Sequence, residues 1–492
     1  MKLAALIKGL KTKKITGSVH KNITSIHYDS LTVKKESLFI CKKGSNTDGH
    51  LYSSQAINNG ATVLISEHEI AHPSSITNII VPDASQAQAQ ISANFYNHPD
   101  KQLHIIAITG TNGKTTTSYF LKQLFCQLKI PCGLIGTIAY EFGKKQIAAT
   151  RTTPESTDLF GLFDAINKQH IKWVIMEVSS HAIDQNRVFG IDFAGAIFTN
   201  LSSEHLDYHK TMPRYFSAKN KLFTRLSAST PAIINTDDEY GKKIGANYAG
   251  PTYTYGTAPS CFLQLVSYEL HTAHSHARIR TPLGNYSITI SLPGKYNLYN
   301  AIAALSVGFI FNFDIDTCIQ ALQTLKNVPG RMESVGRDLP FSVFIDYAHT
   351  EDALEKALES LRLLPSKRII CVFGCGGNRD QNKRAKMGKV SGLLADVTII
   401  TTDNPRNENP LDIIKQIERG VKQTSGDYSL IPDRKEAIFH ALGIANENDI
   451  VLIAGRGHET VQDFGNKQHF LCDQLVVQEW KRCITRKKRR KE

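Results

Sequence analysis

The chain has 492 residues, 41% of them hydrophobic and 21% charged, and its formal net charge is +13. This length is too great for one hydrophobic core and predicts about three domains, while the composition is that of a soluble globular protein. No apolar run approaches the ~18 residues that a bilayer span needs, and the five apolar residues before Lys8 are too few for a secretory signal, so we expect a cytoplasmic protein without a transmembrane segment.

The first hundred residues predict a small domain of short strands. Three β-like runs, at 37–43, 61–67 and 76–82, are separated by turn residues. Between the first two lies GSNTDGH, residues 44–50, which its composition identifies as a loop. We place the first domain at residues 1–100.

The following residues, 101–329, have the pattern of a parallel α/β sheet and form the second predicted domain. HIIAIT at 104–109 is typical of a buried strand, and it leads through a glycine-rich turn into a helix with apolar periodicity. Further strand-like runs lie at 173–179, 195–201 and 232–237, with helical stretches between them.

A second α/β set begins after NVPGRME, and we place the third domain at residues 330–492. Its strands are predicted at 341–348, 367–375, 396–403 and 449–455, with helical segments between them. In open parallel sheets, ligands bind beyond the carboxyl ends of the strands. The residues that follow these strands are therefore the candidate site residues.

The turn after the first central strand, GTNGKTT, has the context of a phosphate-binding loop, with a strand before it and a helix after it. Gly110 and Gly113 allow backbone N–H groups to turn inward around phosphate oxygens, and the helix N-terminus adds a partial positive charge. Lys114 can bridge the β- and γ-phosphates, and the Thr115 hydroxyl can bind Mg²⁺. Because Ile108 stands where the usual GxxxxGK[ST] pattern has its first glycine, ordinary GTPases and helicases fit poorly.

Two polar residues follow later strands and extend this site. Glu177, in MEVSSH, stands at a strand end where its carboxylate can reach a metal ion, and His205, in NLSSEHLDYH, can share a divalent ion with a carboxylate. Taken singly, such a glutamate is more often a surface residue and such a histidine a structural one.

Ten motifs in order give the chain a resemblance to the Mur ligases. They run over about residues 25 to 465 and are GTNGKTT, MEVSSH, NLSSEHLDYH, YFSAKNKLF, PGKYNLYN, PGRME, DYAHTEDAL, FGCGGNRD, DNPRNENP and GRGHET. The family shares the shortened loop GTNGKT, which accounts for Ile108. The resemblance implies an α/β fold of three domains: an N-terminal domain that binds a UDP substrate, a central parallel-sheet ATPase domain with the phosphate loop, and a Rossmann-like C-terminal domain that binds an amino acid and ends in a basic tail.

Within the family, the chain looks most like the members that add meso-2,6-diaminopimelate to UDP-N-acetylmuramoyl-L-alanyl-D-glutamate in peptidoglycan precursor synthesis. The resemblance implies an ATP-dependent ligase that forms an acyl phosphate, which the incoming amine then attacks. Such chemistry needs cations, because carboxylate and phosphates crowd together. The implied cofactors are ATP, Mg²⁺ and a CO₂-derived carbamate on Lys219, in YFSAK. The implied partners are the two small-molecule substrates, and we expect a monomer that does not bind nucleic acid.

The family's motifs also imply site residues in this sequence. The catalytic set is Lys114, Glu177, His205 and Lys219. The residues expected to bind ATP are Gly110, Thr111, Asn112, Gly113, Lys114, Thr115 and Thr116. Two Mg²⁺ ions are expected, the first bound by Thr115 and Glu177 and the second by Glu177, His205 and carbamylated Lys219. The residues expected to bind the UDP substrate are Ser30, Ser45, Asn46, Thr47, Thr152, Thr153, Ser179, Gln185 and Arg187.

A last set is expected to bind diaminopimelate. In the family, the DNPR motif accompanies this substrate, and lysine-adding members generally lack its arginine. Diaminopimelate has one more carboxylate than lysine, and the Arg406 guanidinium can pair with that group bidentately. Glu459 has the charge needed to hold the substrate ammonium. The full set is Arg379, Asp403, Asn404, Pro405, Arg406, Gly455 and Glu459.

Some features depart from the family pattern or leave alternatives open. Leu31, Asn378 and Arg456 stand where arginine, aspartate and lysine are usual. We interpret the basic tail, 486–492, as a solvated terminus, the alternative being an electrostatic arm for nucleic acid or acidic membrane. The alternative functions are a lysine-adding or folylpolyglutamate-synthetase-like ligase, and a non-enzymatic protein that binds nucleotide or nucleic acid.

Overall fold

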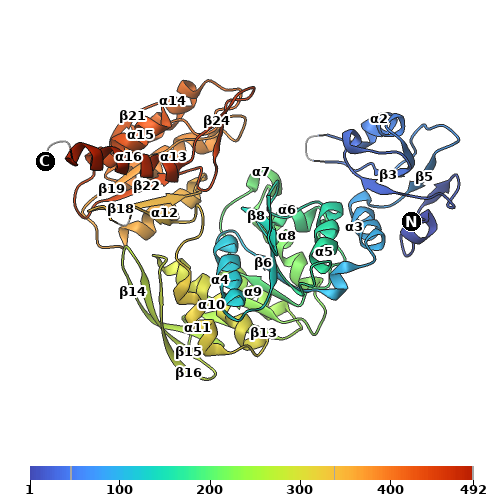
Figure 1. Cartoon of the computed structure of the whole chain (residues 1–492), viewed down its shortest axis with the longest axis horizontal. Helices are drawn as coiled ribbons and strands as arrows, with labels where there is room; N and C mark the ends of the chain where they lie inside the picture. The colour runs from blue at the N-terminus through green and yellow to red at the C-terminus, as the bar shows by residue number, and fades with distance from the viewer. Residues whose placement is uncertain (45–46, 337, 490–492) are drawn as a thin grey trace.

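The computed structural model describes residues 1–44, 47–336 and 338–489, with side chains up to residue 484. The chain forms three successive α/β units, each built on its own large sheet. Figure 1 shows the N-terminal and C-terminal units on either side of the central one. This arrangement confirms the predicted α/β class. The boundaries at residues 100 and 329 stay predictions.

The N-terminal unit is a five-stranded sheet in the order β1-β5-β4-β3-β2, parallel except for β1. Its strands are β1 (Lys14–Thr16), β2 (Ser25–His27), β3 (Ser37–Ile40), β4 (Ala61–Ser66) and β5 (Thr77–Ile80). Its helices are α1 (Leu3–Leu6), α2 (Ser53–Asn58) and α3 (Ala84–Phe95), with 3₁₀ turns η1 (Ser30–Thr32), η2 (Gly49–Tyr52) and η3 (Pro99–Gln102). Alternate residues of β3 enter two cores, with Leu38 and Ile40 on the α1 and α3 side and Phe39 on the α2 side.

The central unit is an eleven-stranded sheet in the order β16-β15-β14-β13-β12-β11-β6-β10-β7-β8-β9. Its parallel strands include the four runs expected from the sequence, found as β6 (His104–Thr109), β10 (Trp173–Glu177), β11 (Gly195–Phe198) and β12 (Ala232–Asn235). Its other strands are β7 (Cys132–Ile135), β8 (Ala139–Phe142), β9 (Lys145–Ala148), β13 (Thr252–Gly256), β14 (Leu263–Leu270), β15 (Ser275–Thr281) and β16 (Gly284–Ile290).

Helices cover both faces of this sheet because its central strands are apolar on both sides. Ile106 and Ile108 of β6 pack with α4, α10 and α11, whereas Ile105 and Ala107 pack with α5 and α8. The helices are α4 (Lys114–Gln127), α5 (Ser156–Asn167), α6 (Ser180–Asp184), α7 (Leu206–His209), α8 (Met212–Thr224), α9 (Glu239–Asn247), α10 (Lys295–Ile310) and α11 (Ile315–Thr324).

The C-terminal unit is a six-stranded sheet in the order β17-β18-β22-β19-β20-β21, parallel except at β17. The strands are β17 (Glu333–Val335), β18 (Ser342–Asp346), β19 (Ile369–Phe373), β20 (Val397–Ile400), β21 (Asp427–Leu430) and β22 (Ile450–Ala454), followed by the hairpin of β23 (Val461–Asp463) and β24 (Gln468–Phe470). The helices are α12 (Glu351–Arg362), α13 (Asn382–Leu394), α14 (Pro410–Val421), α15 (Arg434–Ile444) and α16 (Asp473–Arg489).

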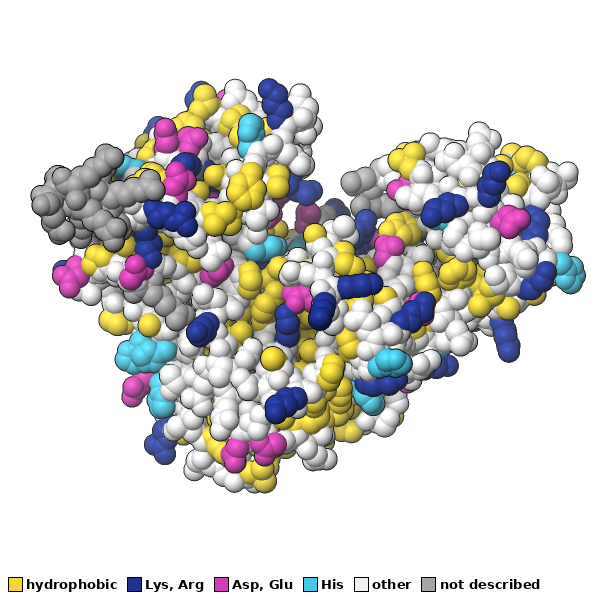
Figure 2. All heavy atoms as spheres, in the orientation of Figure 1, with side chains coloured by type: hydrophobic (Ala, Val, Ile, Leu, Met, Phe, Trp, Pro, Cys, Tyr) yellow, Lys and Arg dark blue, Asp and Glu magenta, His cyan; other side chains and the backbone are white. Residues whose placement is uncertain are grey.

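The molecular surface is hollowed between the N-terminal and C-terminal units, above the central one, and Figure 2 shows charged side chains and histidine within this hollow. None of the helices in the described parts of the chain has the length and apolarity that crossing a bilayer requires.

Candidate functional site

The phosphate loop joins β6 to α4, as expected. Its two glycines have positive φ values, 148° at Gly110 and 86° at Gly113. A Cβ atom at Gly110 would lie 1.9 Å from Thr199 Oγ1, and one at Gly113 would lie 2.3 Å from Asn300 Oδ1. Both positions therefore need glycine, for backbone conformation and for space.

The Lys114 side chain curls back over this loop. Its Nζ donates hydrogen bonds to the carbonyl oxygens of Gly110, at 2.9 Å, and Thr111, at 2.7 Å. The free N–H groups at the start of α4 add to this positive charge, so the loop is built for an anion. Of the other loop residues, Asn112 is half-buried, while Thr111, Thr115 and Thr116 are buried.

Glu177 lies at the end of β10, beside the loop, and is only 1% exposed. Thr115 donates its hydroxyl to Glu177 Oε2 at 2.9 Å, so the structure brings together the two residues predicted for the first Mg²⁺. Thr137, which follows β7, donates its backbone N–H to Oε1 at 3.1 Å and its hydroxyl to Oε2 at 2.9 Å. Because all these partners are neutral, the buried carboxylate fits a divalent cation.

Thr137 was not among the predicted site residues, although it follows a strand on the same edge of the sheet. The adjacent Gly136 is also required, because a Cβ atom there would lie 2.4 Å from Glu177 Oε1. In the sequence, the tripeptide IGT at residues 135–137 ends a strand-like run, and this pattern could have indicated a further site residue at the end of a strand.

Lys219 lies on α8 and is 1% exposed, although a lysine on an amphipathic helix normally faces solvent. Its Nζ donates to the Gly110 carbonyl oxygen at 2.7 Å and lies 4.9 Å from the centre of the Tyr215 ring. Burial, followed by repulsion from Lys114, holds the pKa of Lys219 well below its ordinary value. A neutral amine has the lone pair that reaction with CO₂ requires, so these surroundings fit a carbamate.

His205 begins α7 and has a left-handed backbone, with φ of 57°. Its Nε2 lies 3.7 Å from Glu204 Oε2, and its ring lies 4.8 Å from that of His181. Within the described residues, no three His, Cys, Asp or Glu side chains are grouped so that they could hold a metal ion. A second Mg²⁺ at Glu177, His205 and Lys219 would need the acid that carbamylation adds, and it stays a prediction.

Charged groups from the C-terminal unit also face the phosphate loop. Although burial opposes it, the neighbouring side chains of His205, Lys114, His349 and Lys219 hold the pKa of Glu204 below its usual value. His349 precedes α12, where Asp352 accepts a hydrogen bond from the Ser202 hydroxyl at 3.0 Å. Two units of the chain therefore meet at this loop.

Arg331 is a further residue that the sequence reasoning missed. Burial lowers the pKa of Lys114, and the positive charge of Arg331 acts in the same direction. The Arg331 guanidinium lies 5.0 Å from the centre of the Tyr347 ring. In the sequence, Arg331 is the arginine of the PGRME motif, and we predicted no role for this arginine.

The residues predicted for the UDP substrate lie in two groups. In the N-terminal unit, Ser30 donates its hydroxyl to Gln55 Oε1 at 2.8 Å, and Thr47 is exposed. Ser45 and Asn46 lie outside the described residues. Leu31, which replaces the usual arginine, is 75% exposed.

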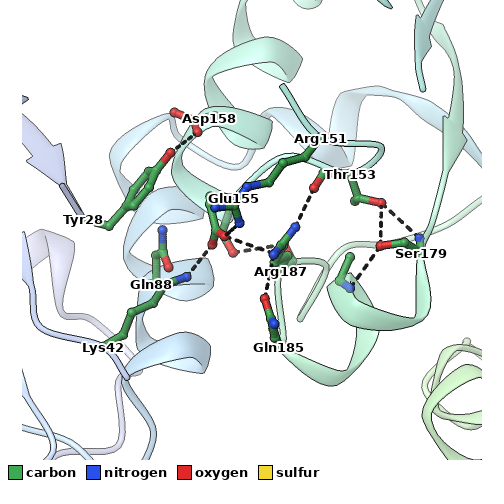
Figure 3. A network of polar contacts seen from close by, with 12 residues as sticks. Tyr28, Lys42, Gln88, Arg151, Thr153, Glu155, Asp158, Ser179, Gln185 and Arg187 are labelled. Carbon is green, nitrogen blue, oxygen red and sulfur yellow. Dashed lines mark hydrogen bonds and ion pairs between the residues drawn. The ribbon is translucent and has the colours of Figure 1, made fainter. Parts of the chain in front are cut away.

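The other group lies next to Glu177 and is drawn in Figure 3 in part. Thr152 shares a hydrogen bond with Thr137 at 3.1 Å, and the Thr153 hydroxyl donates to the Glu177 carbonyl oxygen at 2.9 Å. The Ser179 N–H donates to the Thr153 hydroxyl at 3.0 Å. The structure thus brings these three residues to the edge of the sheet that carries Thr115 and Glu177.

Gln185 and Arg187 lie in the same group. Arg187 Nη2 donates to Gln185 Oε1 at 2.6 Å, and Nη1 donates to the Thr153 carbonyl oxygen at 2.9 Å. Within the protein, Arg187 pairs with the carboxylate of Glu155, whose Oε1 lies 3.1 Å from Arg187 Nε.

The residues predicted for diaminopimelate follow β19, β20 and β22 in the C-terminal unit. Asn404 donates to Glu459 Oε2 at 2.8 Å and accepts a hydrogen bond from Arg456 at 3.0 Å. A Cβ atom at Gly455 would lie 2.7 Å from Asp403 Oδ2, a buried oxygen without a hydrogen-bond partner. Pro405 is buried in the same segment, and Arg379 is exposed.

Arg406 and Glu459, the pair predicted to bind the two ends of diaminopimelate, are side chains of opposite charge. The Arg406 guanidinium donates one hydrogen bond, to the Gly377 carbonyl oxygen at 2.7 Å, and lies 3.6 Å from Asp463 Oδ2. Burial raises the pKa of Glu459, and the Tyr347 hydroxyl donates to its Oε1 at 3.4 Å. Tyr347 is another residue that the sequence reasoning did not assign.

Three domain families match successive parts of the chain: the "Mur ligase family, catalytic domain" at residues 22–107, the "Mur ligase middle domain" at 108–308, and the "Mur ligase, glutamate ligase domain" at 330–457. The chain is 41% identical to the UDP-N-acetylmuramoyl-L-alanyl-D-glutamate–2,6-diaminopimelate ligase of Caldanaerobacter subterraneus subsp. tengcongensis, over 97% of this chain and 98% of that protein.

Solved structures of Mur ligases have the same fold as this chain. A structure of a UDP-N-acetylmuramoyl-L-alanyl-D-glutamate–2,6-diaminopimelate ligase superimposes with a TM-score of 0.68 and 28% identity, over 98% of both chains. A MurF ligase from Thermotoga maritima, solved in complex with ADP, superimposes with a TM-score of 0.61 and 19% identity, over 88% of this chain and 94% of that one.

Proposed function

The chain belongs to the Mur ligase family, and from this premise we propose that it adds meso-2,6-diaminopimelate to UDP-N-acetylmuramoyl-L-alanyl-D-glutamate with consumption of ATP. The observation that carries the proposal is the similarity to curated ligases of this specificity over nearly the whole chain. The local geometry supports it, because the buried carboxylate of Glu177 and the buried amine of Lys219 each make a hydrogen bond to the phosphate loop segment.

The reaction begins at the phosphate loop. The free backbone N–H groups at the start of α4 would bind the phosphates of ATP, and Lys114 would leave its two carbonyl partners to neutralise the γ-phosphate. The glutamate side-chain carboxylate of the UDP substrate then attacks the γ-phosphorus, which yields an acyl phosphate and ADP. The amine of diaminopimelate attacks the acyl carbon and displaces phosphate.

Mg²⁺ fits the buried pair of Thr115 and Glu177, where it would supply positive charge next to the phosphate oxygens. We further propose that Lys219 becomes a carbamate and, with His205, holds a second ion. The support for this is the burial of the Lys219 amine and its position 2.7 Å from the phosphate loop.

On the amine side, we propose that Arg406 binds the distal carboxylate of diaminopimelate and that Glu459 binds its ammonium. The guanidinium of Arg406 retains donors that the protein does not use, and a planar fork matches a carboxylate. Because the residues of all three substrate sites come from one chain, we propose a monomer, and because its substrates are a nucleotide-linked sugar and ATP, we propose that it acts in the cytoplasm.

Phosphate release from ATP tests the proposal. The purified protein is incubated with UDP-N-acetylmuramoyl-L-alanyl-D-glutamate and with meso-diaminopimelate or L-lysine in turn. We expect phosphate release with diaminopimelate and much less with lysine, because only the former has a carboxylate for Arg406. Efficient release with lysine would contradict the specificity. Salt-sensitive binding to DNA without phosphate release would instead favour a nucleic-acid-binding protein.

The basic tail, residues 486–492, includes the end of α16, and its last three residues lie outside the described residues. Deletion of the tail is expected to leave kcat within about twofold of the full chain, because the sequence predicts a terminus that takes no part in the folded site. Phosphate release measured on both proteins at equal concentration checks this. A loss of tenfold or more would mean that the tail takes part in the reaction.

A further inference from the structure

One carboxylate, that of Glu155, is surrounded by three cationic side chains, and Figure 3 shows them converging on it. Lys42 pairs with Oε2, while Arg151 and Arg187 share Oε1, the latter at 3.1 Å. Glu155 is the N-cap residue of α5, yet its side chain makes no capping hydrogen bond. The carboxylate is therefore turned away from its own helix and toward the cations.

This cluster, Lys42, Arg151, Glu155 and Arg187, has an excess of two positive charges. Its interior is shielded from water, since the side chains of Glu155 and Arg187 are 4% and 8% exposed, whereas that of Arg151 is 49% exposed. Although burial opposes it, Lys42 and the two arginines hold the pKa of Glu155 below its usual value. The cluster can thus accept a further anion from its open side.

The cluster also joins two units of the chain. Lys42 follows β3 of the N-terminal unit, and its Nζ is the cation bound to Glu155 of the central unit. Tyr28, from the same unit as Lys42, donates its hydroxyl to Asp158 on the first turn of α5 at 2.5 Å. The start of α5 is therefore where the unit with the predicted uridine site is docked.

Arg187 connects the cluster to the reacting end of the site. Its Nη1 donates to the Thr153 carbonyl oxygen, and the hydroxyl of Thr153 donates to the Glu177 carbonyl oxygen. Arg187 Nε lies 3.1 Å from Glu155 Oε1, which is an ion-pair distance, but its N–H is not aligned for a hydrogen bond. Among the described residues, this buried N–H therefore has no hydrogen-bond partner. A small rotation would let the guanidinium bind a ligand anion while it remains next to Glu155.

We propose that Glu155 is a positioning residue for the acidic peptide arm of the UDP substrate. Its carboxylate binds Arg187 and thereby orients the guanidinium that receives this arm. The same carboxylate binds Lys42 and thereby holds the N-terminal unit, with the predicted uridine site, against the central unit. The inference rests on the proposed function. It adds a residue that touches no reacting atom and acts through its two partners.

Glu155→Gln tests this role, because it keeps the shape of the side chain and removes the charge. We expect the KM for the UDP-sugar dipeptide to rise about 10- to 100-fold, since a buried ion pair loses one partner, while kcat falls less than threefold. The Kd of UDP alone, measured by calorimetry, should change less than twofold, because UDP lacks the peptide arm. Glu155→Asp should recover part of the loss in KM.

Lys42→Met tests the same contact from the other unit, in case the first variant folds poorly. A double-mutant cycle on kcat/KM should show that the two substitutions together cost less than the product of their separate effects. Asp164→Asn is the matched control, because it removes an ion pair with Lys168 on the exposed part of the same helix, and it should leave KM unchanged.

A KM within twofold of wild type in Glu155→Gln would overturn the inference, as would an equal weakening of UDP binding, which would mean that Glu155 only supports the fold. If the wild-type protein releases no phosphate with either amino acid, the proposed function fails instead. The comparison of Kd values for UDP and for the UDP-sugar dipeptide then still decides the role of Glu155.

Discussion

Lys219→Ala is expected to lower kcat by a factor of about 10³ or more, because it removes the group proposed to become a carbamate beside the phosphate loop. Lys219 is almost fully buried against Gly110 and Tyr215, so no other side chain of α8 can replace it. Short carboxylic acids such as acetate should restore part of the activity by filling the vacated space with an anion. The measurement is ATP-dependent phosphate release with and without the acid.

Two further substitutions separate an anion from a cation at this position. Lys219→Arg keeps a positive charge that cannot be carbamylated, and it should be as inactive as the alanine variant. Lys221→Ala, on the same helix, removes only a half-exposed ion pair with Asp184 and should keep its activity. Full activity of Lys219→Ala, or full activity of Lys219→Arg, would exclude the carbamate.

Arg406→Ala is expected to raise the KM for meso-diaminopimelate about 100-fold, because a charge-assisted pair with the distal carboxylate is lost. The KM for ATP should change less than twofold, because the phosphate loop belongs to a different unit of the chain. Steady-state kinetics with each substrate varied in turn measures both quantities.

L-Lysine provides the internal control for this variant. Since lysine has no distal carboxylate, its weak activity should be nearly the same in wild type and in Arg406→Ala. Arg406→Lys should lie between the two proteins with diaminopimelate, because an ammonium can pair with the carboxylate but not as a fork. An unchanged KM for diaminopimelate in Arg406→Ala would remove the explanation of specificity given above.

The parts of the site that lie close together in the sequence were predictable. The loop from Gly110 to Thr116 carries its own signal, because a buried strand, two glycines and a helix start are all local features. The pairing of Thr115 with Glu177 was also predictable, because both follow parallel strands whose carboxyl ends lie on one edge of the sheet.

The parts that depend on long-range contacts were not predictable in this way. Glu155 was not predicted as a site residue, because its partner Lys42 is 113 residues away, in another unit of the chain. Thr137 and Arg331 were missed for the same reason, since their neighbours Glu177 and Lys114 are known only once the strand order is known. The antiparallel strands β14 to β16, which extend the central sheet, were also not anticipated.

Lys114 and Lys219 both donate to one acceptor, the carbonyl oxygen of Gly110. A carbonyl oxygen has two lone pairs, so the Nζ atoms of Lys114 and Lys219 occupy both acceptor positions of Gly110. The two side chains are therefore held close together, and any positive charge on both makes them repel each other. Any ligand that draws Lys114 toward phosphate relieves that repulsion and leaves the oxygen to Lys219 alone. We therefore expect nucleotide binding and the proposed carbamylation of Lys219 to be coupled, and phosphate release measured with ATP and CO₂ supplied in either order tests this.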